Sequence, residues 1–248
     1  MIYIFLILAA IILLLYMYTE AHRNRVSFEV IKMDKLPASF KNFKIFFISD
    51  LHKRVVTDIV LNQAGKADIV IIGGDLVERG VQMDRVEANI RMLSEIGPVY
   101  FVWGNNDYDV DTNLLKQTLT DNGVSILDNS CISLEREDEM VDIAGVNDLS
   151  FRKDNVEDAL MNCRSSCRIL ISHNPDISRK IKPDYQIRLV LSGHTHGGQI
   201  RLGPLGIAKK GGWYDEGYYL LLVSNGFGAT HLPLRFGAPC EAHLITLN

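Results

Sequence analysis

The sequence predicts an α/β protein that begins with a membrane-spanning helix. Three times in succession, an apolar strand-like run ends in a short polar loop and is followed by a helical stretch; the runs cover 43–49, 69–72 and 99–103. Runs of this length that are apolar almost throughout are typical of strands buried on both faces of a sheet. Strands that alternate with helices build a parallel or mixed sheet, and such sheets carry their functional groups at the carboxyl ends of the strands.

The second half of the chain is richer in strands. We expect strands near 125–127, 132–135, 141–146, 168–172, 188–192, 218–223 and 242–247, a helix near 83–96 and a glycine-rich loop over 203–212. Residues 19–40 are interpreted as a polar stalk that leads into an edge strand. No linker divides the remainder, so we predict an anchor and juxtamembrane segment over 1–22 and one large domain over 23–248.

The anchor is predicted from an unbroken apolar run over residues 2–18, which contains no charge, proline or glycine. As a helix this run extends roughly 25 Å, close to the hydrocarbon thickness of a bilayer. Tyr3, Tyr16 and Tyr18 lie near its ends, where aromatic rings favour the membrane interface. A cleaved signal peptide fits less well, because no Lys or Arg precedes the run and no small-x-small site follows it. A buried core helix would have to be apolar on every side.

The flanking charges predict the orientation of this single-pass anchor in the cell membrane. Arg23, Arg25, Lys32 and Lys35 follow the apolar run, whereas only the terminal amine precedes it. Positive residues near a membrane span tend to remain in the cytoplasm. We therefore expect the main domain on the cytoplasmic side.

Composition narrows the class of protein and its partners. Hydrophobic residues make up 47% and charged residues 23% of the 248 residues, which excludes a mostly disordered chain. The formal net charge of −4 provides no basic field, so nucleic acid is not an expected partner. The four cysteines include no CxxC pair, and free thiols are expected, with pairing or metal binding by Cys163 and Cys167 as the alternative.

Potential metal ligands gather where the strand-like runs end. Four of the seven histidines, two aspartates and an asparagine occupy these ends: Asp50, His52, Asp75, Asn105, His173, His194 and His196. Carboxylate, carboxamide and imidazole groups suit Mn, Fe, Zn or similar divalent ions better than ions that prefer thiolates. One Asp-x-His pair, or one histidine after a strand, is a weak signal because such residues are often structural. Five strand ends of this kind in one chain are not expected by chance.

These residues form a series that resembles the motifs of calcineurin-like metallophosphoesterases. The matching motifs, in order, are Asp50-x-His52, Gly74-Asp75, Gly104-Asn105-Asn106-Asp107, His173 and Gly193-His194-Thr195-His196. The runs 193–199 and 228–236, with Pro239, are similar to a bacterial, membrane-anchored branch of that family. The resemblance covers the chain from about residue 40 to its end. It implies a four-layer α/β/β/α sandwich in which two mixed sheets pack face to face between helices.

The resemblance also implies a metal-dependent phosphoric ester hydrolase with two divalent metal ions. By this resemblance, the first ion would be bound by Asp50, His52 and His196. The second would be bound by Asn105, His173 and His194, and Asp75 would bridge the two ions. Two cations roughly 3.5–4 Å apart repel one another, and a shared carboxylate offsets that repulsion. Such a pair activates water for attack on phosphorus and stabilises the oxygens on which charge accumulates.

One position departs from the family pattern. Many relatives have histidine directly after the metal-binding asparagine, where it meets the substrate and protonates the leaving oxygen; this chain has Asn106, followed by Asp107, which would orient an imidazole at that position. A carboxamide donates hydrogen bonds but is no acid near neutral pH. Either the leaving group needs little protonation, or another residue or a water supplies the proton. The substitution favours pyrophosphates or other activated diesters over simple monoesters.

Weaker candidates lie towards the end of the chain. His231 is a candidate replacement acid, with an ordinary surface histidine as the alternative. Arg235 is a candidate ligand for a substrate phosphate, because guanidinium binds phosphate in a bidentate manner, and a structural ion pair is the alternative. Trp213 and Tyr214 are interpreted as part of a solvated loop, with a lip that faces substrate or membrane as the alternative.

The sequence thus predicts hydrolysis of a phosphodiester or pyrophosphate bond in a lipid-linked or nucleotide substrate reached at the membrane. The alternatives are a phosphomonoesterase, or a metal-binding scaffold in which Asn106 has impaired catalysis. Nuclease activity is disfavoured by the net negative charge.

Overall fold

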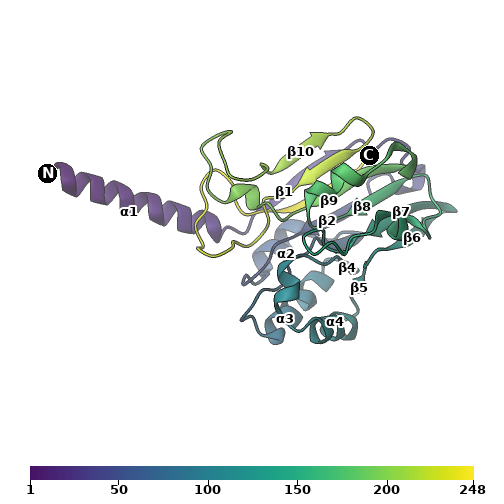
Figure 1. Cartoon of the computed structure of the whole chain (residues 1–248), viewed down its shortest axis with the longest axis horizontal. Coiled ribbons are helices and arrows are strands. Elements are labelled where there is room, and N and C mark those ends of the chain that lie inside the picture. Colours follow the sequence, from purple (N-terminus) through teal and green to yellow (C-terminus); the bar gives the residue numbers. More distant parts are fainter.

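Two six-stranded sheets pack face to face in the computed structural model, which describes residues 1–248 (Figure 1). The first sheet has the order β1 (Val26–Ile31), β12 (Ala242–Leu247), β2 (Lys44–Ile48), β3 (Ile69–Ile72), β4 (Val99–Phe101), β5 (Ser125–Ile126). The second has the order β10 (Gly212–Asp215), β11 (Leu220–Val223), β9 (Ile187–Ser192), β8 (Arg168–Ile171), β7 (Glu139–Gly145), β6 (Ser130–Arg136). Both sheets mix parallel and antiparallel pairs, as predicted.

Three apolar layers separate four layers of structure. Alternate residues of β2 show why its apolar run is continuous: Ile45 and Phe47 pack between the sheets, whereas Phe46 and Ile48 pack under the outer helices. Those helices are α2 (Asp58–Ala64), α3 (Met83–Ser94) and α4 (Thr112–Asp121). The outer face of the second sheet is covered by α5 (Val156–Leu160) and by neighbouring turns. The predicted α/β/β/α sandwich is therefore confirmed.

Parallel pairing brings the polar strand ends together at one edge of each sheet. The strands β2, β3 and β4 are neighbours in parallel, with Phe47 opposite Ile71 and Ile72 opposite Phe101. In the second sheet β7, β8, β9 and β11 are likewise parallel. Because parallel strands end at the same edge, the loops after β2, β3, β4, β8 and β9 share one end of the sandwich.

One expectation about individual residues is corrected, and the expected free thiols are confirmed. Trp213 and Tyr214 lie in β10, where antiparallel pairing with β11 satisfies the backbone, so the predicted loop ends before them. Trp213 also packs against the core between the sheets. Cys163 has Cys131 as its neighbour rather than Cys167, because α5 packs over β6; all four cysteines are free.

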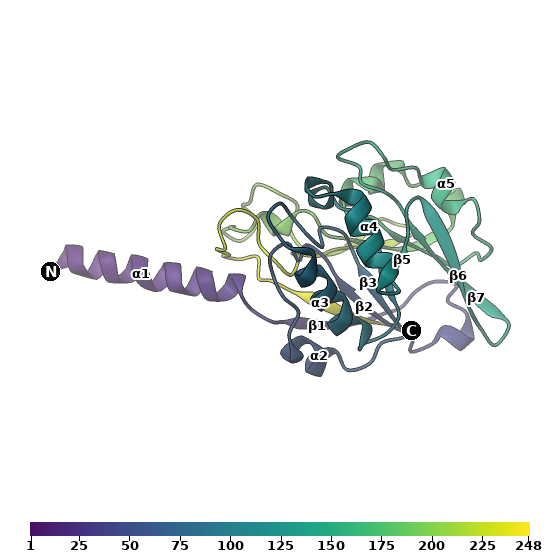
Figure 2. The same ribbon diagram turned by 90° about the horizontal axis from the view of Figure 1, so that it is seen from below.

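The N-terminal helix α1 (Ile2–Ala21) extends away from the sandwich in both views (Figures 1 and 2). It is long and apolar enough to cross a membrane. Its last turns are held by the domain, since Met17 and Ala21 are buried there. The Arg235 amide donates to the Met17 carbonyl at 2.9 Å, and the Cys240 thiol donates to the Ala21 carbonyl at 3.2 Å. The end of α1 is thus fixed to the loop that contains Arg235.

Candidate metal centre

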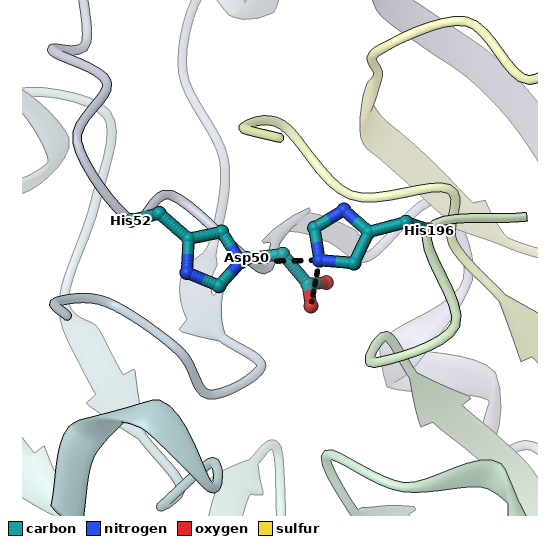
Figure 3. Close-up of side chains that lie close together, drawn as sticks. All are labelled: Asp50, His52 and His196. Atoms are coloured by element: carbon teal, nitrogen blue, oxygen red, sulfur yellow. Dashed lines mark hydrogen bonds and ion pairs between the residues drawn. The ribbon is translucent and has the colours of Figure 1, made fainter. Parts of the chain in front are cut away.

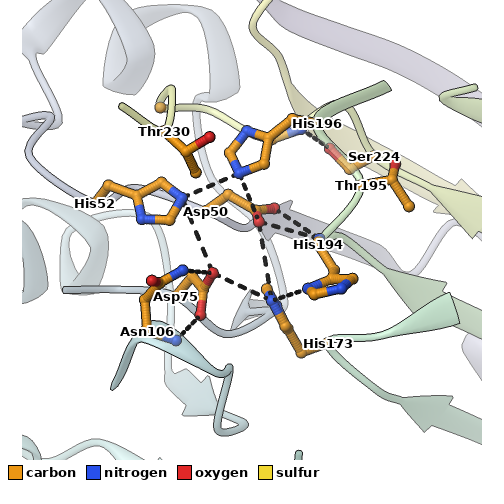
Figure 4. Close-up of polar contacts among 12 residues, drawn as sticks. Asp50, His52, Asp75, Asn106, His173, His194, Thr195, His196, Ser224 and Thr230 are labelled. Carbon is orange, nitrogen blue, oxygen red and sulfur yellow. Dashed lines mark hydrogen bonds and ion pairs between the residues drawn. The ribbon is translucent and has the colours of Figure 1, made fainter. Parts of the chain in front are cut away.

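The seven predicted ligands converge at the shared end of the two sheets, and Figure 4 shows all of them except Asn105, which lines the same cavity as Asp75, His194 and His196. Each follows a strand: Asp50 and His52 follow β2, Asp75 follows β3, Asn105 follows β4, His173 follows β8, and His194 and His196 follow β9. The first three strands belong to one sheet and the last two to the other. The cluster therefore exists only where the two sheets face each other.

The imidazole nitrogens meet in two pairs. His52 Nε2 lies 3.1 Å from His196 Nε2, and His173 Nε2 lies 3.2 Å from His194 Nδ1. Two nitrogens that each lie about 2.1 Å from one cation, at ordinary coordination angles, are separated by roughly 3.0–3.4 Å. The two pairs thus have the spacing of ligands that share an ion.

The two carboxylates lie between these pairs. Asp50 Oδ1 is 3.4 Å from His196 Nε2 and 4.0 Å from His173 Nε2. Asp75 Oδ2 is 3.3 Å from His173 Nε2 and 3.9 Å from His52 Nε2. Figure 3 shows Asp50 with His52 and His196, the three residues whose ligand atoms lie within 4.8 Å of one another. A second group with the same spacing consists of Asp50, Asp75 and His173.

The donor atoms are oriented for cations by their surroundings. His173 Nδ1 contacts the Gly73 carbonyl at 2.9 Å, and His52 Nδ1 lies 3.2 Å from Glu78, so the Nε2 atom of each ring faces the cluster. The Asn105 side-chain oxygen is buried and has no hydrogen-bond partner. A buried carboxamide oxygen without a donor is costly unless a ligand satisfies it. These oxygen and nitrogen donors fit hard or borderline divalent ions.

The backbone at this site is strained. Residues other than glycine rarely adopt positive φ, and each instance costs on the order of 1–3 kcal/mol. Five of the seven candidate ligands have φ between 49° and 69°: Asp50, His52, Asp75, His194 and His196. Glycines supply the remaining space, since a Cβ at Gly104 would collide with the Asp75 carboxylate and one at Gly193 with that of Asp50.

Charge is concentrated in this buried cluster. Burial would raise the pKa of Asp75, but attraction to His173 and His52 lowers it below its usual range. Burial opposes the charged form of His173, yet Asp75 and Asp50 raise its pKa to about 10. Burial lowers the pKa of His196 to about 3, which leaves a neutral ring that can bind an ion. The carboxylates therefore stay ionised and require positive charge nearby.

A cavity of about 550 Å³ opens over the cluster. Among the candidate ligands, Asp75, Asn105, His194 and His196 line it, and so does Asn106. Its wall also includes Lys53, Glu78, Arg79, Thr230 and His231. The cavity is polar, with two cationic side chains at its wall, as a site for a phosphorylated ligand requires.

The other predicted site residues have distinct surroundings. Asn106 donates from its side chain to Asp75 Oδ2 at 2.6 Å and from its amide to Asp75 Oδ1 at 2.8 Å. Asp107 is fully buried and accepts from the amides of Gly104, Asp75 and Val77, so it supports the loops rather than the substrate. Burial and the Asp75 charge raise the pKa of Asp107 to about 7.

Arg235 does not have the expected contact with a substrate phosphate. Its side chain is 0% exposed, and it donates to the carbonyls of Ala238 at 3.0 Å and Asn225 at 2.7 Å. Its Nη2 also lies 2.8 Å from His196 Nδ1. Because the guanidinium is enclosed by backbone, Arg235 positions His196 and cannot reach the cavity.

Three residues of the site were not predicted from the sequence. Glu78 contacts His52 and Lys53, and these neighbours, His52 above all, lower the pKa of Glu78 to about 2. Lys53 and Arg79 contribute positive charge to the cavity wall. Lys53 directly follows a predicted ligand and could have been noticed, whereas Glu78 and Arg79 have no motif signal.

Comparisons with known proteins show the family of this chain. The sequence model of the calcineurin-like phosphoesterases matches residues 43–198. The chain belongs to the calcineurin-like phosphoesterase family. It is 40% identical over 238 residues to the uncharacterized protein YpbG of Bacillus subtilis, covering 93% of this chain and 90% of YpbG. It is 31% identical to the uncharacterized metallophosphoesterase YkuE of the same organism, covering 93% of this chain and 88% of YkuE.

A more distant relative carries a more specific description. The phosphodiesterase YaeI of Escherichia coli is 30% identical over 202 residues, covering 77% of this chain and 73% of YaeI. Among solved structures, the 5′-nucleotidase precursor from Thermus thermophilus has a TM-score of 0.52 at 13% identity. That likeness covers 82% of this chain but 54% of the other, so the chain spans about half of that structure and shares its fold.

The contact between Glu78 and His52 yields a testable expectation. Glu78→Gln should weaken binding of the metal held by His52 by roughly 10- to 100-fold, because loss of the outer carboxylate loosens the ring. Competition with a chelator of known affinity measures this change. Glu87→Gln on α3 is the matched control, since Glu87 is a partly exposed carboxylate that pairs with Arg91 at 4.0 Å and does not line the cavity. Equal metal affinity in Glu78→Gln and wild type would contradict the role.

The position of Asp75 between the imidazole pairs yields a second expectation. Asp75→Asn should lower phosphodiester turnover by a factor of roughly 10² or more, about as much as removal of the metals. Elemental analysis should find close to two metal ions per wild-type chain and fewer in the variant. Asp84→Asn, exposed on α3, serves as the control. A fully active Asp75→Asn protein, or an active metal-free wild type, would refute the assignment.

Proposed function

We propose that this protein is a membrane-anchored hydrolase that cleaves a phosphodiester or pyrophosphate bond with two divalent metal ions. The observation that carries the proposal is the convergence of two carboxylates and two imidazole pairs beneath a polar cavity. Membership of the calcineurin-like phosphoesterases supports the reaction class. The relation to the phosphodiesterase YaeI supports a diester as the substrate bond.

The ligands divide between the two ions as the family resemblance implies. We assign the first ion to Asp50, His52 and His196. We assign the second ion to Asn105, His173 and His194, with Asp75 as the bridge between the two. The position of Asp75 between His173 and His52 supports its bridging role. When bound, two ions of Mn, Fe or Zn supply positive charge that activates water and stabilises the phosphoryl oxygens. Asp50 lies close to both pairs and adds to the charge they share.

The other residues bind and orient the substrate. Lys53 and Arg79 at the cavity wall attract the phosphate, and Arg79 is the more available because Lys53 is paired with Glu78. Asn106 fixes the Asp75 carboxylate through two hydrogen bonds. His231 is exposed and lines the cavity, so it remains the candidate acid for the leaving oxygen. Its position supports that role better than a purely structural one.

The substitution at Asn106 determines which bonds the site suits. The Asn106 carboxamide donates its hydrogen bond to Asp75 and cannot protonate a leaving alkoxide. The leaving groups of pyrophosphates and activated diesters depart without protonation, whereas the alkoxide of a simple monoester requires it. A phosphomonoesterase, or a metal-binding scaffold without turnover, is the alternative function.

We further propose that α1 crosses the cell membrane once and holds the domain on the cytoplasmic side. Its length and apolar composition support the span, and the basic residues that follow it support the orientation. Phosphorylated substrates met at the membrane, lipid-linked or nucleotide, are then the accessible ones. Nucleic acid is disfavoured by the formal net charge of −4.

Leaving-group dependence tests the role of Asn106. Across a series of aryl phosphodiesters, the logarithm of the wild-type rate should fall steeply as leaving-group pKa rises. Asn106→His should flatten the slope and accelerate poor leaving groups by roughly 10- to 100-fold, because an imidazole can donate the proton. Asn106→Gln retains a carboxamide and should leave the slope steep.

Two outcomes would redirect the proposal. A flat dependence in wild type would show that another acid protonates the leaving group, and His231→Ala would then identify it by steepening the slope. No turnover with any monoester, diester or pyrophosphate, despite two bound metals, would refute hydrolysis and favour the scaffold.

The anchor has its own test. Full-length protein should fractionate with membranes and resist extraction by high salt, because the apolar helix and not charge holds it there. The domain should resist protease added outside intact cells. Soluble fractionation with intact Met1 would refute the anchor, and digestion from outside would refute the cytoplasmic orientation.

A further inference from the structure

Exposed apolar side chains gather beside the end of α1. They lie on two loops, 200–207 and 229–236, which flank that end of the helix in both views (Figures 1 and 2). Five of them form what we call the apolar rim, with exposed fractions of 49%, 67%, 72%, 95% and 68%: Ile200, Leu202, Leu205, Ile207 and Leu232. Scattered single apolar residues are ordinary, but a group next to a candidate membrane span is not.

Contacts with α1 fix the depth of these loops. The Arg235 amide is bonded to the Met17 carbonyl, and the Phe236 ring meets the Tyr16 ring edge-on at 6.0 Å between centroids. Tyr16 and Met17 lie within the last turns of the helix, where the apolar run ends. Backbone hydrogen bonds hold the first loop at the same level. The Arg201 amide donates to the Phe236 carbonyl at 2.8 Å, and the Phe236 amide donates to the Gln199 carbonyl at 2.9 Å. The rim therefore lies at the height where the helix would leave the hydrocarbon.

The first loop is built so that its backbone needs little water. The buried Arg201 side chain donates to the carbonyls of Gly203 and Pro204 at 3.1 Å, Ala208 at 3.3 Å and Gly197 at 2.5 Å. Leu202 and Leu205 exchange backbone hydrogen bonds of 2.9 and 3.0 Å. Backbone groups that enter a membrane must find partners within the protein. One guanidinium thus satisfies the carbonyls while the apolar side chains turn outward.

The same loops form a wall of the metal cavity. Ile207 belongs to both the rim and the cavity lining, and Ala208, Thr230 and His231 line the cavity from the two loops. Lys53 and Arg79 lie across the same cavity. When the phosphate of a ligand lies at the metal centre, the rest of the ligand therefore extends past the apolar rim, beside the end of α1.

We propose that the apolar rim enters the membrane interface, and that the substrate is a phosphodiester or pyrophosphate carried by a membrane lipid. The acyl or polyprenyl part stays in the bilayer beside Leu205 and Leu232, while the headgroup phosphate reaches the cavity. A nucleotide would gain nothing from the rim. This inference rests on the proposed hydrolase and its anchor, and it names the substrate class of the same site.

Fluorescence tests the rim without reference to activity. The full chain is reconstituted in vesicles that contain phosphatidylcholine brominated in its acyl chains, and Leu205→Trp is compared with Met161→Trp. Met161 is 73% exposed after α5, away from the rim. Tryptophan at 205 should be blue-shifted and quenched by bromine, whereas tryptophan at 161 should not. Equal, unquenched emission at both positions would overturn the inference.

Two substrates with one leaving group test the substrate class. One is a p-nitrophenyl phosphodiester of diacylglycerol in vesicles, and the other is bis(p-nitrophenyl) phosphate in solution. The double variant Leu205→Glu, Leu232→Glu should lose roughly 10-fold or more of its turnover on the lipid and keep that on the soluble diester, since charges at the rim oppose contact with the interface. Met161→Glu should alter neither.

The outcomes separate this inference from the proposed function. The lipid substrate would be overturned if wild type hydrolyses the soluble diester as well as the lipid and the double variant keeps both activities. The proposed hydrolase would be unaffected by that result. Absence of turnover on both substrates and on a soluble nucleotide pyrophosphate would refute the hydrolase and with it the lipid substrate. Bromine quenching would still decide whether the rim enters the membrane.

Discussion

Two carboxylates, Asp50 and Asp75, are buried against four imidazole rings at the place where the two sheets face each other. Buried ionised carboxylates are costly unless opposite charge lies near them, and here the histidines supply only part of it because His196 stays neutral. The arrangement is therefore suited to cations. The positive φ angles of five candidate ligands lower the stability of the fold, so the rest of the structure must hold these residues in place.

Arg235 links this centre to the rest of the molecule. Its guanidinium lies against His196 and backbone carbonyls, while its amide holds the Met17 carbonyl at the end of α1. One buried residue thus connects the loop of a candidate ligand to the helix that leaves the domain. The metal centre and the expected membrane surface consequently have a defined position relative to one another, which a flexible stalk would not provide.

Asp107 and Asn106 show how neighbouring residues divide their roles. Asp107 collects three backbone amides from two loops and so fixes the carboxyl ends of β3 and β4. Asn106 uses its side chain to hold Asp75. A histidine at position 106 would therefore find the Asp107 carboxylate already bonded to backbone amides, and its imidazole would act without that partner.

The sequence by itself predicted most of the strands and the seven candidate ligands, and its resemblance to a known family predicted the four layers. Continuous apolar runs such as 45–48 are buried on both faces of a sheet, and polar residues shortly after them lie at its edge. The family and the mixed two-sheet sandwich, predicted from the order of those motifs, are confirmed. Local patterns of this kind are readable because strand periodicity and turn chemistry depend on neighbours in the chain.

Only the tertiary structure decided which residues meet across the chain. Glu78 contacts His52 and Arg235 contacts His196 because separate loops pack together, and no local pattern records such contacts. Arg235 changed from an expected phosphate ligand to a buried positioning residue for the same reason. Trp213 is in a strand because its partner is Leu222, and the apolar rim lies beside α1 because Phe236 meets Tyr16. Contacts between residues far apart in the sequence form only when the fold packs their strands and loops together, so a local sequence pattern does not reveal them.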